Sequence, residues 1–169
     1  YTSSAMQMDD YLQLIEGKRF VIVGNQTSIV GETHLVDTLL ARGIDIVKIY
    51  TPEHGFRGTA DAGAKIDNGK DSKTGIPILS LYGKTKKPTP EMLQGIDIIL
   101  FDLQDVGVRF YTYISTLTYV MEAAAENGLP VVVLARPNPN GFYVDGPVLK
   151  SENQAFVGMH AVPVVYGMT

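Results

Sequence analysis

Five short, largely apolar runs constrain the fold of this chain more than any other feature. They span residues 20–23, 44–50, 77–81, 96–101 and 130–134. Runs this short and this apolar are typical of strands that are covered on both faces, as in a parallel sheet. A further apolar stretch at residues 162–169 predicts another strand at the end of the chain.

Helical patterns separate several of these runs. Apolar residues recur at helical spacing in residues 8–19, 34–42 and 114–127. Residues 89–91 read Thr-Pro-Glu, which predicts an N-cap, a proline in the first turn and a first-turn acid, and Gly95 would close that short helix.

The alternation of strands and helices predicts right-handed βαβ units. We therefore expect an α/β, Rossmann-like fold, with an open, mostly parallel sheet and helices on both faces. Residues 1–19 would form an N-terminal helical segment, and residues 20–169 one Rossmann-like domain, which suits a chain of 169 residues. The polar, glycine-containing residues 58–75 predict a long functional loop.

Composition and missing motifs exclude several functions. A formal charge of −4 gives no electrostatic footprint for nucleic acid, and no apolar run is long enough for a membrane span. With no cysteine, thiolate metal sites and cysteine nucleophiles are excluded, and the three histidines lack metal-ligand spacing. Glycine-rich dinucleotide, P-loop and nucleophile-elbow motifs are absent, so we predict neither cofactor nor metal.

Polar side chains follow each of the five predicted strands. Ligands of open α/β sheets bind outside the carboxyl ends of the strands, so we expect these side chains to line one crevice. Amides, carboxylates and guanidinium groups suit sugar hydroxyls, and aromatic rings suit the face of a sugar. The candidates, in chain order, are Asn25, Glu53, His54, Arg57, Tyr82, Asp102, Gln104, Asp105, Arg109, Tyr111, Arg136 and Asn138.

Some of these residues also have structural interpretations. Asn25 could satisfy backbone groups in a turn after the first strand, and Glu53 could cap a helix instead of acting as a tuned acid. Asp102 ends a fully apolar strand, where an unpaired carboxylate would be costly. We expect it to pair with Arg109 or Arg136, so a structural and a catalytic role both stay open.

Four strand-end strings together resemble one known family. Residues 51–58 read T-P-E-H-G-F-R-G and residues 80–83 read S-L-Y-G. Residues 101–113 read F-D-L-Q-D-V-G-V-R-F-Y-T-Y, and R-P-N-P at 136–139 precedes D-G-P at 145–147. In this order, the strings resemble the exo-β-N-acetylmuramidases (NamZ-like), long described as a domain of unknown function. The resemblance runs from about residue 20 onward and matches the N-terminal domain of that family.

The resemblance implies a glycoside hydrolase that releases N-acetylmuramic acid from the non-reducing end of peptidoglycan fragments. Glu53 stands at the family's catalytic glutamate and would be the general acid. The other strand-end candidates would bind or orient the sugar, and an arginine among them would pair with the lactyl carboxylate of muramic acid. The second catalytic group could be Asp102 or Asp105, a residue beyond this chain, or the acetamido group of the substrate.

Members of this family resemble two-part proteins about twice this long, with the active cleft between an N-terminal and a C-terminal domain. The resemblance therefore implies a C-terminal domain that is absent here, and it leaves open whether this chain is active alone. A peptidoglycan substrate favours the periplasm or the cell exterior, with the cytoplasm as the alternative. The rival function is a non-catalytic module that binds a muramyl or other amino sugar.

Overall fold

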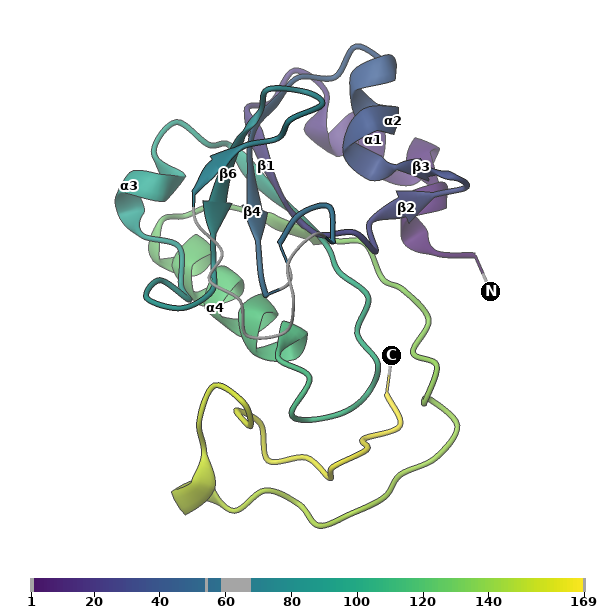
Figure 1. The fold of residues 1–169 in the computed structure, drawn as a ribbon, viewed down its shortest axis with the longest axis vertical. Helices are drawn as coiled ribbons and strands as arrows, with labels where there is room; N and C mark the ends of the chain where they lie inside the picture. Colours follow the sequence, from purple (N-terminus) through teal and green to yellow (C-terminus); the bar gives the residue numbers. More distant parts are fainter. Residues whose placement is uncertain (1, 54, 59–67, 169) are drawn as a thin grey trace.

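A six-stranded sheet forms the centre of the computed structural model, which describes residues 2–53, 55–58 and 68–168 (Figure 1). The strand order is β5-β6-β4-β1-β7-β8, and every pair is parallel except β5 with β6. The predicted α/β, mostly parallel fold is thus confirmed. The strands are β1 (Phe20–Gly24), β4 (Ile46–Thr51), β5 (Gly69–Lys70), β6 (Pro77–Ser80), β7 (Ile98–Asp102) and β8 (Val131–Val133).

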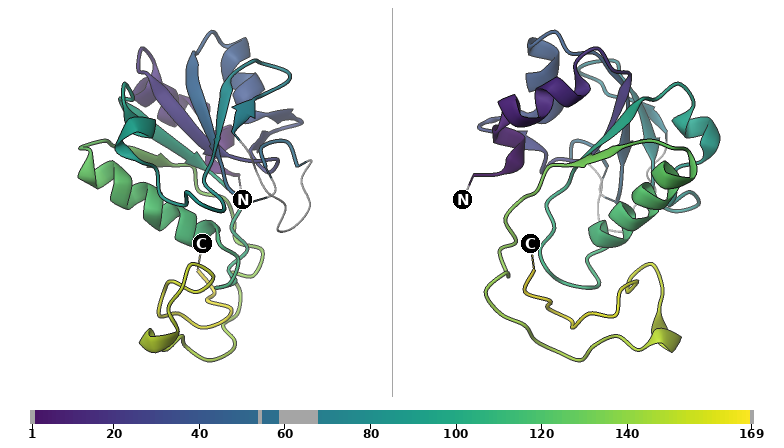
Figure 2. Two further views of the ribbon diagram at one scale, coloured as in Figure 1. Left: turned by 60° about the vertical axis from the view of Figure 1, so that its left-hand side comes forward. Right: turned by 180° about the vertical axis from the view of Figure 1, so that it is seen from behind.

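Helices cover both faces of this sheet (Figure 2). Helices α1 (Met8–Ile15) and α2 (Leu35–Ala41) pack on one face, and α3 (Pro90–Leu93) and α4 (Tyr113–Glu126) pack on the other. The predicted cap of α3 is present, since the Thr89 side chain accepts a hydrogen bond from the Met92 amide at 3.3 Å. The remaining short elements are η1 (Ser4–Met6), η2 (Ser151–Asn153) and the hairpin of β2 (Ile29–Val30) and β3 (Thr33–His34).

The central strand β1 shows why the sheet needs two layers of helices. Successive strand residues point to opposite faces. Phe20 and Ile22 join the core under α1 and α2, whereas Val21 and Val23 join the core under α3 and α4. All four side chains are fully buried. This explains the continuous apolar run, because neither face of the strand meets water.

The N-terminal segment belongs to the same core as the sheet. Met8, Tyr11 and Ile15 of α1 are buried against it, and the Tyr11 hydroxyl donates a hydrogen bond to the Ala5 carbonyl at 3.0 Å. Helix α1 ends at Ile15, earlier than the pattern over residues 8–19 predicts. Residues 5–15 of the predicted N-terminal helical segment thus share one hydrophobic core with the strands.

The strand order reverses next to β1, and this positions the site. Along the chain, β4 and β6 add to one side of β1, and β7 and β8 then add to the other. The loops that leave β1 and β7 therefore run in opposite directions at the carboxyl edge of the sheet. Such a reversal leaves room for a ligand between the two loops.

Two predictions about irregular regions need revision. Part of the predicted loop at residues 58–75 forms β5, which pairs with β6, while residues 59–67 lie outside the described residues. The strand predicted at residues 162–169 is absent from the described part, residues 162–168. Only Val165 forms isolated bridges, to Val108 and Asp145, and neighbouring Pro163 has no amide hydrogen to extend a ladder.

The C-terminal segment, residues 137–168, lies beyond the carboxyl ends of the strands (Figure 1). It carries no strand and only the short helix η2. In the described part of the chain, no helix combines the length and hydrophobicity needed to cross a membrane.

Candidate active site

Asn25 occupies the point where the strand order reverses. It directly follows β1 and is fully buried. Its side-chain oxygen accepts hydrogen bonds from the amide and the hydroxyl of Thr27, at 2.9 and 2.6 Å. Its amide nitrogen donates to the Tyr113 hydroxyl, at 2.7 Å. Asn25 therefore shapes the turn, as one interpretation predicts, and also links β1 to the start of α4.

The rest of this turn is tied to the end of β7. The Ser28 hydroxyl donates to the Asp102 carbonyl at 2.6 Å, and the Gln104 amide donates to the Thr27 hydroxyl at 3.2 Å. Gly24 leaves room for this arrangement, because a Cβ atom there would lie 2.8 Å from the Ser28 hydroxyl. The carboxyl ends of β1 and β7 are thus held in a fixed relation by hydroxyl and amide groups.

Glu53 follows β4 at the same edge and is half-buried. Desolvation, together with the charge of Glu53 and a hydrogen bond to it, raises the pKa of the Tyr82 hydroxyl. Burial raises the pKa of the Tyr113 hydroxyl, with smaller contributions from Tyr111 and from the Glu53 charge. Both phenols therefore keep their protons at neutral pH and remain hydrogen-bond donors near this carboxylate.

Tyr113 belongs to the candidate site, although it is not among the candidates that the sequence analysis names. Its ring is buried and meets the Tyr111 ring edge-on, with centroids 4.7 Å apart. Its hydroxyl, however, accepts from Asn25. The sequence does hold one indication of this role. A buried tyrosine hydroxyl needs a hydrogen-bond partner, and the carboxyl edge of the sheet carries many polar side chains.

We expect Tyr113→Phe to lower the free energy of unfolding by about 1–3 kcal/mol, because the buried Asn25 amide loses its acceptor. Urea denaturation measures this change. Tyr119→Phe is the matched control, since the Tyr119 ring stacks on Phe156 and its hydroxyl has no hydrogen-bond partner among the described residues. Equal loss of stability in both variants would contradict the assigned bond.

Asp102 pairs with Arg136, one of the two partners predicted for it. Arg136 donates from Nε and Nη2 to the two carboxylate oxygens, at 2.6 and 2.9 Å, and also from Nη2 to the Ile29 carbonyl at 3.1 Å. The Asp102 side chain is 0% exposed, and burial raises the pKa of its carboxyl group while the guanidinium opposes that rise. Because Arg136 holds both oxygens, the geometry favours a structural role for the pair.

Arg57 is held by two carboxylates. Its Nε and Nη2 donate to Asp71 at 2.9 and 2.7 Å, and its Nη1 and Nη2 donate to Asp37 at 3.2 and 3.1 Å. Lys73 adds a contact to Asp37 at 2.7 Å. The cluster fastens the loop after β4 to helix α2 and to the turn after β5. A sugar-binding role for Arg57 stays a prediction, and its donors are already engaged.

The Arg57 cluster predicts a specific acid sensitivity. The Arg57 guanidinium holds the pKa of the Asp71 carboxyl well below its usual range. A folded-state pKa below the unfolded value of about 3.9 gives stability that is complete above that pH and is lost as the pH falls further. We expect Asp71→Asn to remove this part of the acid dependence, as measured by denaturation from about pH 5 to pH 2. The exposed Asp45→Asn variant should keep it, and an unchanged profile in Asp71→Asn would contradict the assignment.

Three other predicted residues hold the C-terminal segment. The Asp105 carboxylate accepts from the Gly107 amide at 3.1 Å and from the Tyr166 hydroxyl. Arg109 donates from Nη1 to two carbonyls of the segment. Asn138 donates from Nδ2 to the Met168 carbonyl at 2.5 Å. The contacts of Asp105 and Arg109 join the β7–α4 connection to residues 137–168, and the Asn138 bond ties the start of that segment to its end.

Gln104 adds to this bracing from within the same connection. Its Nε2 donates to the carbonyls of Asp105 and Pro137, at 2.7 and 2.9 Å. The Oδ1 atom of Asp105 is buried and has no hydrogen-bond partner in the described part of the chain. Roles of Gln104 and Asp105 toward a sugar remain predictions.

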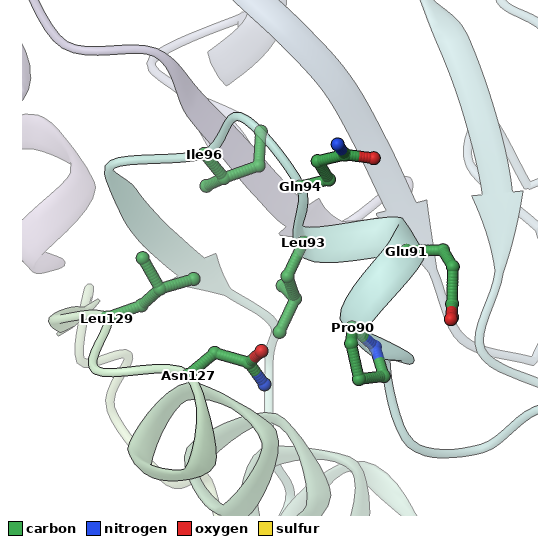
Figure 3. Close-up of a pocket in the computed structure, with 7 residues that line it drawn as sticks. All are labelled: Pro90, Glu91, Leu93, Gln94, Ile96, Asn127 and Leu129. Carbon is green, nitrogen blue, oxygen red and sulfur yellow. The ribbon is translucent and has the colours of Figure 1, made fainter.

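A hollow of about 280 Å³ lies between the ends of β7 and β8, helix α4 and the C-terminal segment. Its walls are mostly apolar, and Asp105, Tyr113 and Arg136 contribute polar groups to them. A larger hollow, of about 390 Å³, lies at the opposite edge of the sheet (Figure 3). Its lining brings together Pro90, Glu91, Leu93, Gln94, Ile96, Asn127 and Leu129, with a single carboxylate and no histidine or cation.

The candidate site is therefore the carboxyl edge around β1, β4 and β7. The structure brings Glu53 near Tyr82 and Tyr113, and Tyr113 contacts both Asn25 and Tyr111. His54 lies outside the described residues. Among the residues that the structure does describe, no group of three histidine, aspartate or glutamate side chains is placed to hold a metal ion.

Comparison with known proteins gives the family. The family model for "Exo-beta-N-acetylmuramidase NamZ, N-terminal" matches residues 20–169. The chain is 49% identical, over 172 aligned positions, to "Peptidoglycan beta-N-acetylmuramidase NamZ" of Bacillus subtilis (strain 168), and the match covers 96% of this chain and 40% of that protein.

Solved structures give the same result. Two crystal structures of DUF1343 family proteins from Bacteroides fragilis superpose with TM-scores of 0.85 and 0.87, at 43% and 40% identity. Each match covers 98% of this chain and 43% or 42% of the other. The chain thus spans about two fifths of the length of these relatives. It belongs to the family of the N-terminal domain of the exo-β-N-acetylmuramidase NamZ.

Proposed function

We propose that this chain forms part of a glycoside hydrolase that releases N-acetylmuramic acid from the non-reducing end of peptidoglycan fragments. Family membership and the name of the Bacillus subtilis relative support the substrate class. Such fragments arise outside the cytoplasmic membrane, so the proposal places the protein in the periplasm or outside the cell. Glu53 is the proposed general acid.

One observation carries the catalytic assignment. Glu53 stands at the carboxyl end of a central strand, and its charge acts on the hydroxyls of Tyr82 and Tyr113. Its chain neighbours Pro52, Gly55 and Phe56 are buried, so the main chain on both sides of Glu53 is packed into the protein. A half-buried carboxyl group hydrogen-bonded to the Tyr82 phenol suits proton transfer to a leaving oxygen.

In the proposed reaction, the bond between the anomeric carbon of the muramyl sugar and the glycosidic oxygen breaks. Glu53 gives its proton to that oxygen as the bond opens, and Tyr82 orients the carboxyl group. A second group must then stabilise the positive charge that develops on the sugar, after which a water oxygen forms the new bond to the anomeric carbon and a proton of that water returns to Glu53. Asp102 has both oxygens held by Arg136. The acetamido group of the substrate, or a residue of the longer relatives, therefore fits that role better.

Two disaccharides test the proposal with the full-length protein. One carries N-acetylmuramic acid at its non-reducing end, and the other carries the same two sugars in reverse order. We expect free N-acetylmuramic acid from the first disaccharide only, detected by liquid chromatography and mass spectrometry. Cleavage of both would contradict the selection of the muramyl end. Saturable binding of the first without cleavage would favour the rival, a non-catalytic sugar-binding module.

A further inference from the structure

The five arginines of the chain all lie within the described residues, and the structure separates their roles. Arg19 forms an ion pair with Asp97 at 2.9 Å. Together with Arg42, it lines a hollow at the start of β1 and β4, at the edge opposite the candidate site. Two of the other three arginines, Arg57 and Arg136, are neutralised by carboxylates of the chain itself.

Arg109 is the arginine that remains, and only one of its edges is in use. Its Nη1 donates to the Pro147 carbonyl at 2.8 Å and to the Val162 carbonyl at 2.7 Å. These bonds use both hydrogens of Nη1. The Nε and Nη2 atoms have no hydrogen-bond partner among the described residues, and no carboxylate of the described chain forms an ion pair with this guanidinium.

The open edge is the one that this chain uses elsewhere for carboxylates. Arg136 binds Asp102 through Nε and Nη2, and Arg57 binds Asp71 through the same pair of atoms. Two parallel hydrogen bonds from this edge match the spacing of carboxylate oxygens. Arg109 presents the same fork without a partner from the chain.

Arg109 is also fixed in position close to the site. Its backbone amide donates to the Val164 carbonyl at 2.8 Å, so both the main chain and the guanidinium are anchored to the C-terminal segment. It lies four residues before Tyr113, which places the two Cα atoms at most about 14 Å apart. Tyr113 in turn responds to the charge of Glu53. The fork therefore belongs to the connection between β7 and α4, which leaves the carboxyl edge of the sheet and also carries Tyr113.

We propose that the Nε and Nη2 edge of Arg109 binds the lactyl carboxylate of the muramyl sugar and thereby selects muramyl over glucosaminyl ends. The inference rests on the proposed function for its substrate. The lactyl ether is the group that distinguishes the two sugars, and its carboxylate is its only charge. A planar, preorganised guanidinium loses little freedom on binding a carboxylate, so it discriminates strongly between an acid and a neutral analogue.

Lys84 is the competing cation at this edge. It follows Tyr82 by two residues, is exposed, and has no ion pair in the described part of the chain. A lysine is a flexible point charge without the two-pronged geometry of arginine. We therefore expect Lys84 to contribute little to the discrimination between an acidic and a neutral sugar. Lys84→Gln is the matched control for Arg109→Gln, because each variant removes one positive charge.

Binding of three sugars to the full-length protein tests the inference without requiring hydrolysis. The ligands are N-acetylmuramic acid, its lactyl methyl ester and N-acetylglucosamine, titrated by calorimetry or by ligand-observed NMR. The proteins are the wild type, Arg109→Gln, Arg109→Lys and Lys84→Gln. We expect the wild type to prefer the acid over the ester by about tenfold or more, as charge-assisted hydrogen bonds imply.

Arg109→Gln should abolish this preference, Arg109→Lys should keep part of it, and Lys84→Gln should keep nearly all of it. Loss of the Nη1 bonds could loosen the C-terminal segment, but this would weaken binding of acid and ester alike. The acid-to-ester ratio therefore reports the carboxylate contact itself. If Arg109→Gln folds poorly, Arg109→Lys still tests the inference, because it keeps the positive charge but loses the paired donors.

The outcomes separate this inference from the proposed function. A preference that survives in Arg109→Gln, or that disappears in Lys84→Gln, overturns the role of Arg109 and leaves muramyl hydrolysis untouched. Failure of the wild type to bind either muramyl ligand contradicts the proposed substrate, and the inference falls with it. Discrimination by Arg109 in a protein that cleaves nothing would support the inference and contradict only the catalytic part of the proposal.

Discussion

Glu53→Gln is expected to lower the rate of release of N-acetylmuramic acid by the full-length protein about 10²–10⁴-fold, which is the usual contribution of a positioned general acid. Glutamine keeps the size and the hydrogen-bonding capacity of the side chain but carries no proton to give. Tyr82 can still donate a hydrogen bond to the amide oxygen, so the local structure should persist. The loss should therefore appear in kcat, with little change in KM or in thermal stability.

A loss in kcat without a change in KM would assign the effect of Glu53→Gln to bond cleavage rather than to substrate binding. Glu16→Gln, at an exposed position just after α1, is the matched control and should behave as the wild type. A leaving group that needs no protonation, such as an activated aryl muramide, should be less affected by Glu53→Gln than the natural disaccharide. Full turnover of the disaccharide by Glu53→Gln would exclude Glu53 as the acid.

The strands, and the edge of the sheet that carries the candidate site, could be predicted because the signals are local. The residues of β1 are apolar without interruption, and a strand buried on both faces requires that pattern. Once the strands are placed, the carboxyl edge follows from the parallel topology. The same reasoning failed for residues 162–168, where an apolar stretch without a neighbouring strand to pair with forms only isolated bridges.

The roles of individual polar residues could not be predicted in the same way, because tertiary contacts decide them. Three arginines follow predicted strands, and nothing in the local sequence shows that Asp71 and Asp37 occupy Arg57 or that Asp102 occupies Arg136. Pairing of Asp102 with either Arg109 or Arg136 agreed with the sequence. In the structure Asp102 pairs with Arg136, and the Nε and Nη2 atoms of Arg109 therefore have no partner among the described residues. Tyr113 shows the converse, a residue that is in the core and at the site together.

Arg136→Met is expected to lower the free energy of unfolding by about 3–5 kcal/mol, the typical cost of removing one partner of a buried ion pair. The Asp102 side chain is 0% exposed, so its carboxylate cannot turn to water when the guanidinium is lost. The Ile29 carbonyl loses a donor as well. Arg19→Met, which breaks the exposed pair with Asp97, is the matched control and should change stability little.

The double variant Asp102→Leu with Arg136→Met separates the cost of an unpaired charge from the value of the pair itself. Without either charge, the end of β7 becomes an apolar site of similar volume, and such replacements are often neutral or stabilising. The double variant should therefore be more stable than Arg136→Met alone, with an interaction energy of at least about 1 kcal/mol in the mutant cycle. Simple addition of the two single losses, measured by urea denaturation, would mean that Arg136 stabilises the fold through packing and its bond to Ile29. A catalytic need for the Asp102 charge would appear separately, as a refolded and stable double variant that still binds N-acetylmuramic acid but no longer releases it.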